Sequence, residues 1–398
     1  MGPRIGLAET LPLPVRSRVA RAVLDCGVMA RRIVIVGGGL MGLSAAFHLR
    51  RADPGAEVTV LERAGVGAAA SGASAAGVRA MGRDPAERAL ALASLARWPD
   101  LDRELEAPTG YRRGGGLRLA LDDAAWRAAP AWVAEQRADG VPVELVDAEA
   151  ARGLAPGVAP ACRGGVHCAI DGQADAMATV RAFATAARRL GTSIDEGAGA
   201  RGLVVERGRV VTVERADGGR LGCDVTIVAA GAWTAALLAP LGVRLPIETR
   251  PLQMLLTEPA PAGLAPVLGA FDHKLSLKQL DDGAYLIGGG WPARVTDHAA
   301  NRYELLEESV QASLATARAV YPPLAWLALA RGWAGLEAFT PDDLPMIGPI
   351  PGIDGLVIAA GFSGHGFALS PMIGDVLARL ALGAEAKLGS GLTIRQMS

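Results

Sequence analysis

Three glycines near the start of the chain have the spacing to hold the phosphates of a dinucleotide. Gly37, Gly39 and Gly42 form a G-x-G-x-x-G motif, directly after a run of β-branched residues and before a helical pattern. In such a motif the first glycine permits a tight turn, the second lets a pyrophosphate approach the backbone, and the third lets helix and strand pack. The free N–H groups that begin the helix then bind the phosphates. We expect Leu40 and Met41, between the last two glycines, to share this site.

A carboxylate follows where the ribose of a dinucleotide is expected. A second apolar run ends in Glu62, about 20 residues after the last glycine, where an acid accepts hydrogen bonds from an adenosine ribose. An ordinary β–α–β unit with a glycine-rich turn is the alternative interpretation. The succession of strand, turn, helix, strand and acid favours the dinucleotide site.

Small residues dominate the segment that comes next. Residues 65–77 are almost entirely glycine, alanine and serine, which suits a backbone pressed against a large planar ligand. The alternative is a flexible linker. Because alanine outnumbers serine and the segment directly follows the ribose-binding strand, we favour the ligand contact.

The composition excludes several classes of function. Among 398 residues, Lys and Arg number 40 and Asp and Glu number 41, so a formal net charge of −1 provides no field for nucleic acid or an anionic membrane. A hydrophobic fraction of 51% argues against disorder. No apolar run is long enough for a transmembrane segment. The length allows two domains.

Cysteine usage indicates a reducing, cytoplasmic setting. Cys26, Cys162, Cys168 and Cys223 show no C-x-x-C spacing, so we expect neither a metal site nor a disulfide framework. Cys162 and Cys168 flank a glycine-containing turn and could lie close together, but two buried thiols are the favoured interpretation.

The first 29 residues differ from the rest. Arg16, Arg18 and Arg21 interrupt any hydrophobic core, so residues 1–29 are not a secretory signal. We expect an extension outside the fold, with Met29 as a hypothetical true start.

Periodicity beyond the glycine motif predicts an α/β protein with a second domain. Helical spacing marks 84–107, the stretch opening at 147, and 176–190, whereas β-branched runs predict strands at 141–146, 203–206, 210–213 and 225–228. Residues 252–335 instead predict an antiparallel sheet with a hairpin turn at 281–283 and a helix at 304–319. A strand at 356–361, a glycine-rich loop and a helix from about Pro371 close the chain. We expect a discontinuous Rossmann-like domain of residues 30–90, 150–245 and 335–398, and an α+β substrate domain of residues 91–149 and 246–334.

Four motifs together resemble one family. They are Glu62-Arg63, the small-residue run 72–77, the run 340–348 (Thr-Pro-Asp…Pro…Ile-Gly) and the loop 361–367 (Gly-Phe-Ser-Gly-His-Gly-Phe). Their types and order resemble the FAD-dependent D-amino-acid oxidase and sarcosine oxidase family from residue 30 onward. The runs 275–280 and 288–291 look most like flavin β subunits of proline or hydroxyproline dehydrogenases, opine oxidases and hydrogen cyanide synthases.

The resemblance implies a reaction and its partners. A hydride would pass from the carbon next to an amine to flavin N5, and the imine product would hydrolyse in water. The substrate would be an amino acid or a secondary amine that is sarcosine-, proline- or opine-like, with O2 or another electron acceptor. A homo-oligomer, or a partner redox subunit without which the chain is inactive, also fits. An NAD-dependent dehydrogenase is the alternative enzyme because Glu62 also suits NAD, and an RNA-modifying role conflicts with the near-zero charge.

The resemblance also implies site residues, with departures that bear on the substrate. Gly335 stands where sarcosine oxidases carry the cysteine that bonds the flavin, so FAD would be non-covalent. Ala368 and Glu337 replace a lysine and an arginine that grip a substrate carboxylate in relatives. The residues expected at the cofactor are Gly37, Gly39, Leu40, Met41, Gly42, Glu62, Arg63, Ala70, Ser71, Ser74, Ala76, Gly77, Val78, Arg79, Val204, Val205, Ala230, Gly231, Trp233, Gly335, Gly361, Gly364, His365, Gly366 and Phe367.

Four side chains are candidates for the chemistry, each with a structural alternative. Glu337 would favour a cationic substrate group, unless it forms a structural salt bridge. Lys278 would lie over the flavin, unless it is solvent-exposed. His365 would take part in catalysis, unless it is a hydrogen-bonded structural histidine. Trp291 would form a wall of the pocket, unless it packs in the core. Arg79 could hold a carboxylate or form a salt bridge.

Overall fold

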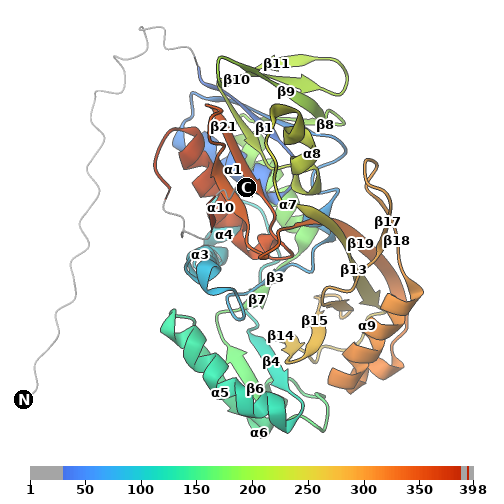
Figure 1. Ribbon diagram of the computed structural model, residues 1–398. Coiled ribbons are helices and arrows are strands. Elements are labelled where there is room, and N and C mark those ends of the chain that lie inside the picture. Colours follow the sequence, from blue (N-terminus) through green and yellow to red (C-terminus); the bar gives the residue numbers. More distant parts are fainter. Residues whose placement is uncertain (1–29, 387–391, 394–398) are drawn as a thin grey trace, which may run out of the picture. The chain divides into compact units, whose positions relative to one another are not determined.

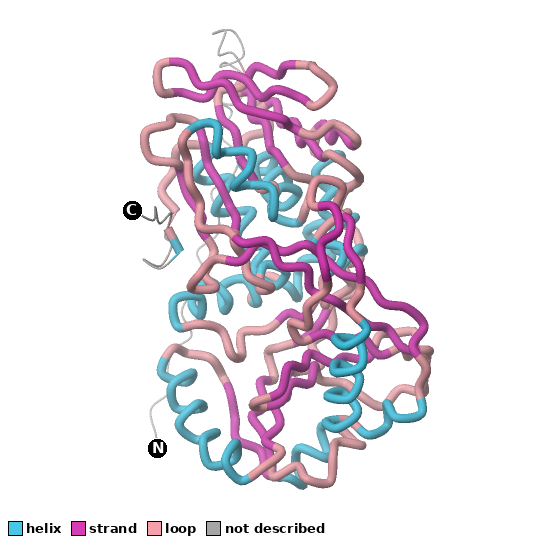
Figure 2. Tube along the Cα trace, turned by 45° about the vertical axis from the view of Figure 1, so that its right-hand side comes forward, coloured by secondary structure: helices cyan, strands magenta, loops and turns pink. Residues whose placement is uncertain are grey.

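A computed structural model describes residues 30–386 and 392–393 of the protein (Figure 1). The expectations for residues 1–29, and with them Met29 and Cys26, lie outside the described residues. The residues from Arg31 onward form one unit, which contains all the elements described below. Most of its strands belong to two large sheets (Figure 2).

The first sheet carries the glycine motif at the end of an inner strand. Its order is β20-β21-β12-β1-β2-β8, and β1 is parallel to both of its neighbours, β2 and β12. Residues 33–36 of β1 are all buried, as expected for a parallel strand covered on both faces. The strands are β1 (Arg32–Val36), β2 (Glu57–Glu62), β8 (Ser193–Glu196), β12 (Val225–Val228), β20 (Met346–Pro349) and β21 (Leu356–Ala360).

Two layers cover this sheet. Ile33 and Ile35 face a core that they share with helices, whereas Val34 and Val36 face a core that they share with a three-stranded sheet. This division follows from the alternation of side chains along a strand. The helices are α1 (Leu40–Ala52), α7 (Ala176–Arg189) and α10 (Gly366–Ala381), and the three strands are β9 (Ala200–Glu206), β10 (Arg209–Arg215) and β11 (Arg220–Gly222).

The second sheet has eight strands in the order β19-β13-β16-β15-β14-β4-β6-β5. Within the described residues its neighbours are antiparallel except β14 and β4, so the expected antiparallel sheet is confirmed apart from this pair. Three helices flank it: α5 (Asp123–Ala138), α6 (Ala148–Leu154) and α9 (Glu307–Val320). The strands are β4 (Gly116–Ala120), β5 (Val143–Asp147), β6 (Gly164–Cys168), β13 (Glu248–Thr257), β14 (Val267–Ala270), β15 (His273–Gln279), β16 (Tyr285–Gly288) and β19 (Leu329–Phe339).

Shorter elements join the two sheets. The long antiparallel pair of β13 and β19 lies at one end of the eight-stranded sheet. The two-stranded hairpin of β17 and β18 projects beside this pair (Figure 1). These shorter elements are α2 (Ala70–Ala73), β3 (Gly77–Val78), β7 (Gly172–Gln173), η1 (Gly231–Trp233), α8 (Thr234–Leu238), η2 (Ala239–Leu241), β17 (Arg294–Asp297), β18 (Arg302–Glu304) and η3 (Pro322–Trp326).

Two helices differ from the expected bounds because of proline. The helix expected over 84–107 is two helices, α3 (Pro85–Leu95) and α4 (Trp98–Leu105), since Pro99 has no N–H to donate to the Leu95 carbonyl. Conversely, α10 begins at Gly366 and continues through Pro371. The Ser370 hydroxyl donates to the Phe367 carbonyl at 2.9 Å, which satisfies the acceptor that proline leaves free.

Three further expectations need correction. Cys162 and Cys168 do not flank a turn, because strand β6 runs between them, although both are buried free thiols as favoured. The α9 helix begins at Glu307, since residues 302–304 belong to β18. β6 pairs within the eight-stranded sheet, although the division at residue 150 assigned it to the Rossmann-like domain. The domain division otherwise stays a prediction.

Across the described part of the chain, no helix combines the length and apolar character needed to cross a bilayer.

Candidate functional site

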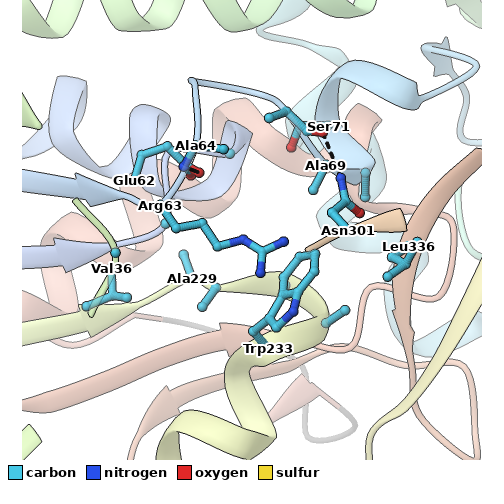
Figure 3. Close-up of a pocket in the computed structure, with 18 of the residues that line it drawn as sticks. Val36, Glu62, Arg63, Ala64, Ala69, Ser71, Ala229, Trp233, Asn301 and Leu336 are labelled. Carbon is cyan, nitrogen blue, oxygen red and sulfur yellow. Dashed lines mark hydrogen bonds between the residues drawn. The ribbon is translucent and has the colours of Figure 1, made fainter. Parts of the chain in front are cut away.

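A cavity of about 510 Å³ opens at the carboxyl ends of β1, β2 and β12 (Figure 3). In a parallel sheet this edge is where ligands bind, because helix N-termini and loops converge there. Nine residues that the sequence assigned to a cofactor line it: Gly37, Gly39, Glu62, Arg63, Ala70, Ser71, Ala230, Gly231 and Trp233. Distant segments of the chain therefore meet at one cavity.

The glycine motif forms the floor of this cavity. Gly37 has φ +116°, and a Cβ there would lie 2.3 Å from the carbonyl oxygen of Ala229. A Cβ on Gly42 would lie 2.0 Å from the Gly37 carbonyl oxygen. The N-cap of α1, Gly39, has no side chain to cap the helix, and the Leu40 N–H donates to Ser71 Oγ at 3.0 Å. The positive end of the helix dipole faces the cavity and favours an anion there. This cradle fits a pyrophosphate.

Glu62 is held rigidly at the end of β2. Its Oε2 accepts from the Gly38 N–H at 2.8 Å, and its Oε1 accepts from the Ala64 N–H at 2.9 Å. A carboxylate has about four acceptor positions, so two remain for ribose hydroxyls. The carboxylate thus fits the role predicted for it.

An aromatic and cationic pair forms one side of the cavity. The Arg63 guanidinium lies 3.5 Å from the centre of the Trp233 ring (Figure 3). Partial burial lowers the pKa of Arg63, which nevertheless stays a cation. The pair presents a planar, positively charged surface, which suits the adenosine end of a dinucleotide.

A second cavity of about 110 Å³ adjoins the first and extends toward α10. The two share Gly39, Ala70, Ser71 and Gly231, so together they form one elongated site. The N-terminus of α10, capped by His365 without a side-chain hydrogen bond, borders it. Further predicted residues that line it are Leu40, Met41, Ser74, Glu337, Gly361, Gly364, Gly366 and Phe367.

Glu337 contributes a carboxyl group to the second cavity. It comes from β19, and burial raises its pKa to about 7, an effect that a hydrogen bond from the Gly364 backbone opposes. No ion pair involves Glu337 among the described residues, and no charged neighbour shifts its pKa. The salt bridge considered as its alternative is therefore not seen in this part of the chain.

His365 belongs to a cluster of buried charges. Its Nδ1 lies 3.3 Å from Oε2 of Glu87, a fully buried carboxylate. Burial, reinforced by the positive charges of Arg83 and Arg79, lowers the pKa of His365 below its ordinary value. The contact with Glu87 favours the structural interpretation of His365 as much as the catalytic one.

Arginines dominate the rest of this cluster. Arg79 has a buried Nε without a hydrogen-bond partner among the residues that the structure describes, and burial lowers its pKa. Arg83 is 7% exposed, and burial together with the charge of Arg79 lowers its pKa to about 10. Asp171 Oδ1 accepts from the Ala80 N–H at 2.7 Å. Sequence reasoning found Arg79 but missed Arg83 and Asp171, whose burial depends on tertiary packing.

Lys278 is buried rather than exposed. Its side chain on β15 is 3% exposed, and Nζ donates to the Ala174 carbonyl at 2.8 Å. Burial lowers its pKa to about 7. Lys274, four residues earlier on the same strand, is exposed. The solvent-exposed alternative is thus wrong for Lys278.

Several predicted residues do not line either cavity. Trp291 donates from Nε1 to the Lys274 carbonyl at 3.0 Å, and lies outside both cavities. Val204 and Val205 pair with β10 in the three-stranded sheet, because the β-branched run that suggested them builds that hairpin. Gly335 packs under α2, where a Cβ would lie 2.8 Å from Ala73 Cβ. The others outside are Gly42, Ala76, Gly77, Val78, Arg79, Lys278 and His365.

Sequence reasoning also missed residues that do line the first cavity. Ala299, Ala300 and Asn301 come from the turn between β17 and β18. Gly199 directly precedes β9, and Ala200 is the first residue of β9. No local pattern marks either segment, since small residues in a turn predict a turn and nothing more.

The chain is similar to a family of known oxidoreductases and to several of their structures. The family described as FAD dependent oxidoreductase (DAO) matches residues 32–380. Glycine oxidase from Pseudomonas putida is 32% identical over 366 residues, which cover 90% of this chain and 96% of that protein. Hydrogen cyanide synthase subunit HcnC from Pseudomonas aeruginosa is 30% identical over 391 residues, covering 87% and 91%. The crystal structure of L-proline dehydrogenase from P. horikoshii superposes with a TM-score of 0.83 at 28% identity, covering 90% and 95%.

Proposed function

Because this chain belongs to the FAD dependent oxidoreductase family, DAO, we propose that it oxidises the C–N bond of an amino acid or secondary amine with FAD bound along the two joined cavities. The observation that carries the proposal is that the two cavities adjoin and share lining residues. The N-terminus of α1 and Glu62 border one end, and the N-terminus of α10 and Glu337 border the other.

The residues present fit this cofactor. Glu62 would hold the adenosine ribose, the open N-terminus of α1 would hold the pyrophosphate, and the loop 361–367 would lie at the flavin end. Of the described cysteines, Cys162, Cys168 and Cys223, none lines either cavity, which supports non-covalent binding. Their free thiols also agree with a cytoplasmic location.

Bound FAD supplies a two-electron acceptor that takes a hydride at N5. The chain must then hold the substrate amine neutral, so that the nitrogen lone pair forms the C=N bond as the hydride leaves. Burial lowers the pKa of Lys278 to about 7, so its neutral amine suits removal of the ammonium proton near neutral pH. The imine product then hydrolyses in water, and O2 or another acceptor takes up the electrons.

Charge in the buried cluster supports an amino-acid substrate. Arg79 has an Nε with no hydrogen-bond partner in the described part of the chain, so it is the candidate to hold a substrate carboxylate in place of the anchors that Ala368 and Glu337 replace. Glu337 is the candidate to hold an ammonium group. Sarcosine-, proline- and opine-like compounds carry both charges.

A second candidate is the flavin subunit of a heteromeric dehydrogenase. The relative HcnC is named as a subunit, which favours this form of the same chemistry. Such a subunit would bind FAD when isolated but turn over poorly without its partner. The alternative of an NAD-dependent dehydrogenase is inconsistent with membership of a family of FAD-dependent oxidoreductases.

The deciding experiment is anaerobic mixing of the purified protein with amines, D- and L-amino acids, cyclic imino acids and opines. Bleaching of bound flavin by one class would identify the substrate, and admitting air would then separate an oxidase from a dehydrogenase. FAD bound without any bleaching would favour a missing partner subunit. Protein purified without flavin, and unable to bind added FAD, would overturn the proposal.

A further inference from the structure

The turn between β17 and β18 lies against the dinucleotide cavity although it belongs to the substrate side of the chain. Ala299, Ala300 and Asn301 line the first cavity together with glycines of the glycine motif. More than half of the chain separates the turn from that motif in the sequence. The hairpin leaves the eight-stranded sheet next to β13, where the Ala293 N–H donates to the Pro251 carbonyl at 2.9 Å. Figure 1 shows it projecting as a separate arm.

Three hydrogen bonds tie the turn to residues of the cofactor site. Arg63 Nη1 donates to the Ala299 carbonyl at 2.6 Å, and Trp233 Nε1 donates to the His298 carbonyl at 2.9 Å. From the turn itself, Asn301 Nδ2 donates to the Ala68 carbonyl at 3.0 Å. The turn is thus joined to segments on different sides of the cavity; Figure 3 shows the bond made by Asn301 and, across the cavity, the Arg63 side chain.

Asn301 is suited to this position in two ways. Its φ of +55° is in the left-handed region, which asparagine adopts more readily than most residues. Its Oδ1 is buried and has no hydrogen-bond donor among the described residues. An unpartnered acceptor beside a ligand cavity is costly unless the ligand supplies a donor, and the ribose and ribityl hydroxyls of FAD are donors.

The other contacts of the hairpin tip are made by His298, whose Nε2 lies 3.0 Å from the Thr249 hydroxyl and whose ring lies 5.3 Å from the Trp233 ring. The side chains of Arg302, Tyr303 and Glu304 are exposed, and β17 and β18 pair as a sheet of two strands. A two-stranded hairpin is marginally stable by itself. Its position over the cavity therefore depends on the hydrogen bonds at its tip.

From these contacts we infer that residues 298–301 are part of the cofactor site and form a latch over FAD, with Asn301 as a cofactor-binding residue. The inference rests on the proposed function, since FAD is the ligand. The latch must open for FAD to enter or leave, and it closes when Asn301 bonds Ala68 on one side and the cofactor on the other.

The test measures how fast FAD leaves the holoprotein. Asn301→Gly removes the amide and tolerates the left-handed backbone, and Asn301→Asp keeps the shape but places an acceptor against the Ala68 carbonyl. The control is Arg302→Ala, an exposed neighbour on the same hairpin. FAD dissociation is followed by the rise in flavin fluorescence after dilution, and the dissociation constant by titration of the apoprotein.

We expect dissociation to be about 2- to 10-fold faster in Asn301→Gly, the effect of one ordinary hydrogen bond, and at least as fast in Asn301→Asp. Arg302→Ala should match the wild type. Trypsin cleavage after Arg302 should also be slower with FAD bound than without it. Equal dissociation rates in all four proteins would overturn the latch. Failure of the wild type to bind FAD would overturn the proposed function instead, and absence of substrate turnover would leave the dissociation test intact.

Discussion

The ammonium of Lys278 donates to the carbonyl oxygen of Ala174 at 2.8 Å inside the protein. Ala174 is itself fixed, because its N–H donates to the Ala76 carbonyl in the small-residue segment. A lysine from the eight-stranded sheet is thereby linked to the segment predicted to face the flavin. Burial lowers its pKa to about 7, so a proton can enter or leave this group near neutral pH.

Replacing Lys278 with methionine should remove one inflection from the pH profile of kcat/KM. Neutral lysine accepts a proton from the substrate ammonium, so the wild-type rate should rise as pH increases through about 7. The measurement is flavin reduction by stopped flow across this range. Lys274→Met is the matched control, because Lys274 lies on the same strand but is exposed. An unchanged inflection in Lys278→Met would assign it to another group.

The Glu337→Gln variant should raise KM for a cationic substrate with little change in kcat. A hydrogen bond to a charged group is stronger than a neutral one, so we expect an increase of about tenfold above pH 7, where the carboxylate is ionised. Below pH 7 the two proteins should converge. Steady-state kinetics at both pH values provides the measurement, and equal KM values above pH 7 would exclude a role in binding the ammonium.

Gly42→Ala should yield protein with little bound flavin. The added methyl would lie 2.0 Å from the Gly37 carbonyl oxygen, so the turn or α1 must shift at a cost of about 1–3 kcal/mol. The FAD content per chain and the Tm report the two effects. Gly153→Ala on α6, where a Cβ meets nothing within 4 Å, is the control and should retain its flavin. Full FAD content in Gly42→Ala would contradict the cradle.

His48 should make the protein less stable in acid. Burial, with a contribution from Arg97, lowers its pKa from 6.5 to about 4. The unfolded chain therefore binds more protons between these values, so stability falls as pH decreases from 6.5 to about 4, by about 3 kcal/mol in total. Above pH 6.5 this histidine contributes no pH dependence.

The check for His48 compares urea unfolding of the wild type and His48→Gln across that range. The difference between the two free energies of unfolding should change with pH, because glutamine does not titrate. Parallel curves would mean that His48 titrates normally. If the variant does not fold, the NMR titration of the His48 ring in the wild type measures the same pKa.

Local patterns predicted the cofactor side of this protein well. A glycine turn, an apolar run and an acid at fixed spacing each determine a local geometry, so Gly37, Gly39 and Glu62 line the cavity, and Gly42 packs against the Gly37 carbonyl. The loop 361–367 was found for the same reason. In contrast, the start of α10 was misplaced, because the contact of Ser370 with the Phe367 carbonyl compensates for a proline in a way that spacing does not reveal.

Other features depend on residues that are distant in the chain. The association of Arg79, Arg83 and Asp171 arises where β7, β3 and α3 converge, and charge in a sequence does not indicate burial. Val204 and Val205 illustrate the opposite error, since a β-branched run predicts a strand but not what it contacts. The turn 298–301 has no pattern at all, although it lines the cavity.

The long ladder of β13 and β19 restricts how this site can diverge. Ten residues of β13 pair in sequence with β19, from Glu248 opposite Phe339 to Thr257 opposite Leu329. Because side chains alternate along a strand, inserting or deleting one residue would turn position 337 away from the second cavity and disturb the whole ladder. A single substitution at 337 leaves the ladder intact. New substrate charge preferences in this lineage should therefore arise by point substitution at 337, and changes in chain length should be confined to the loops.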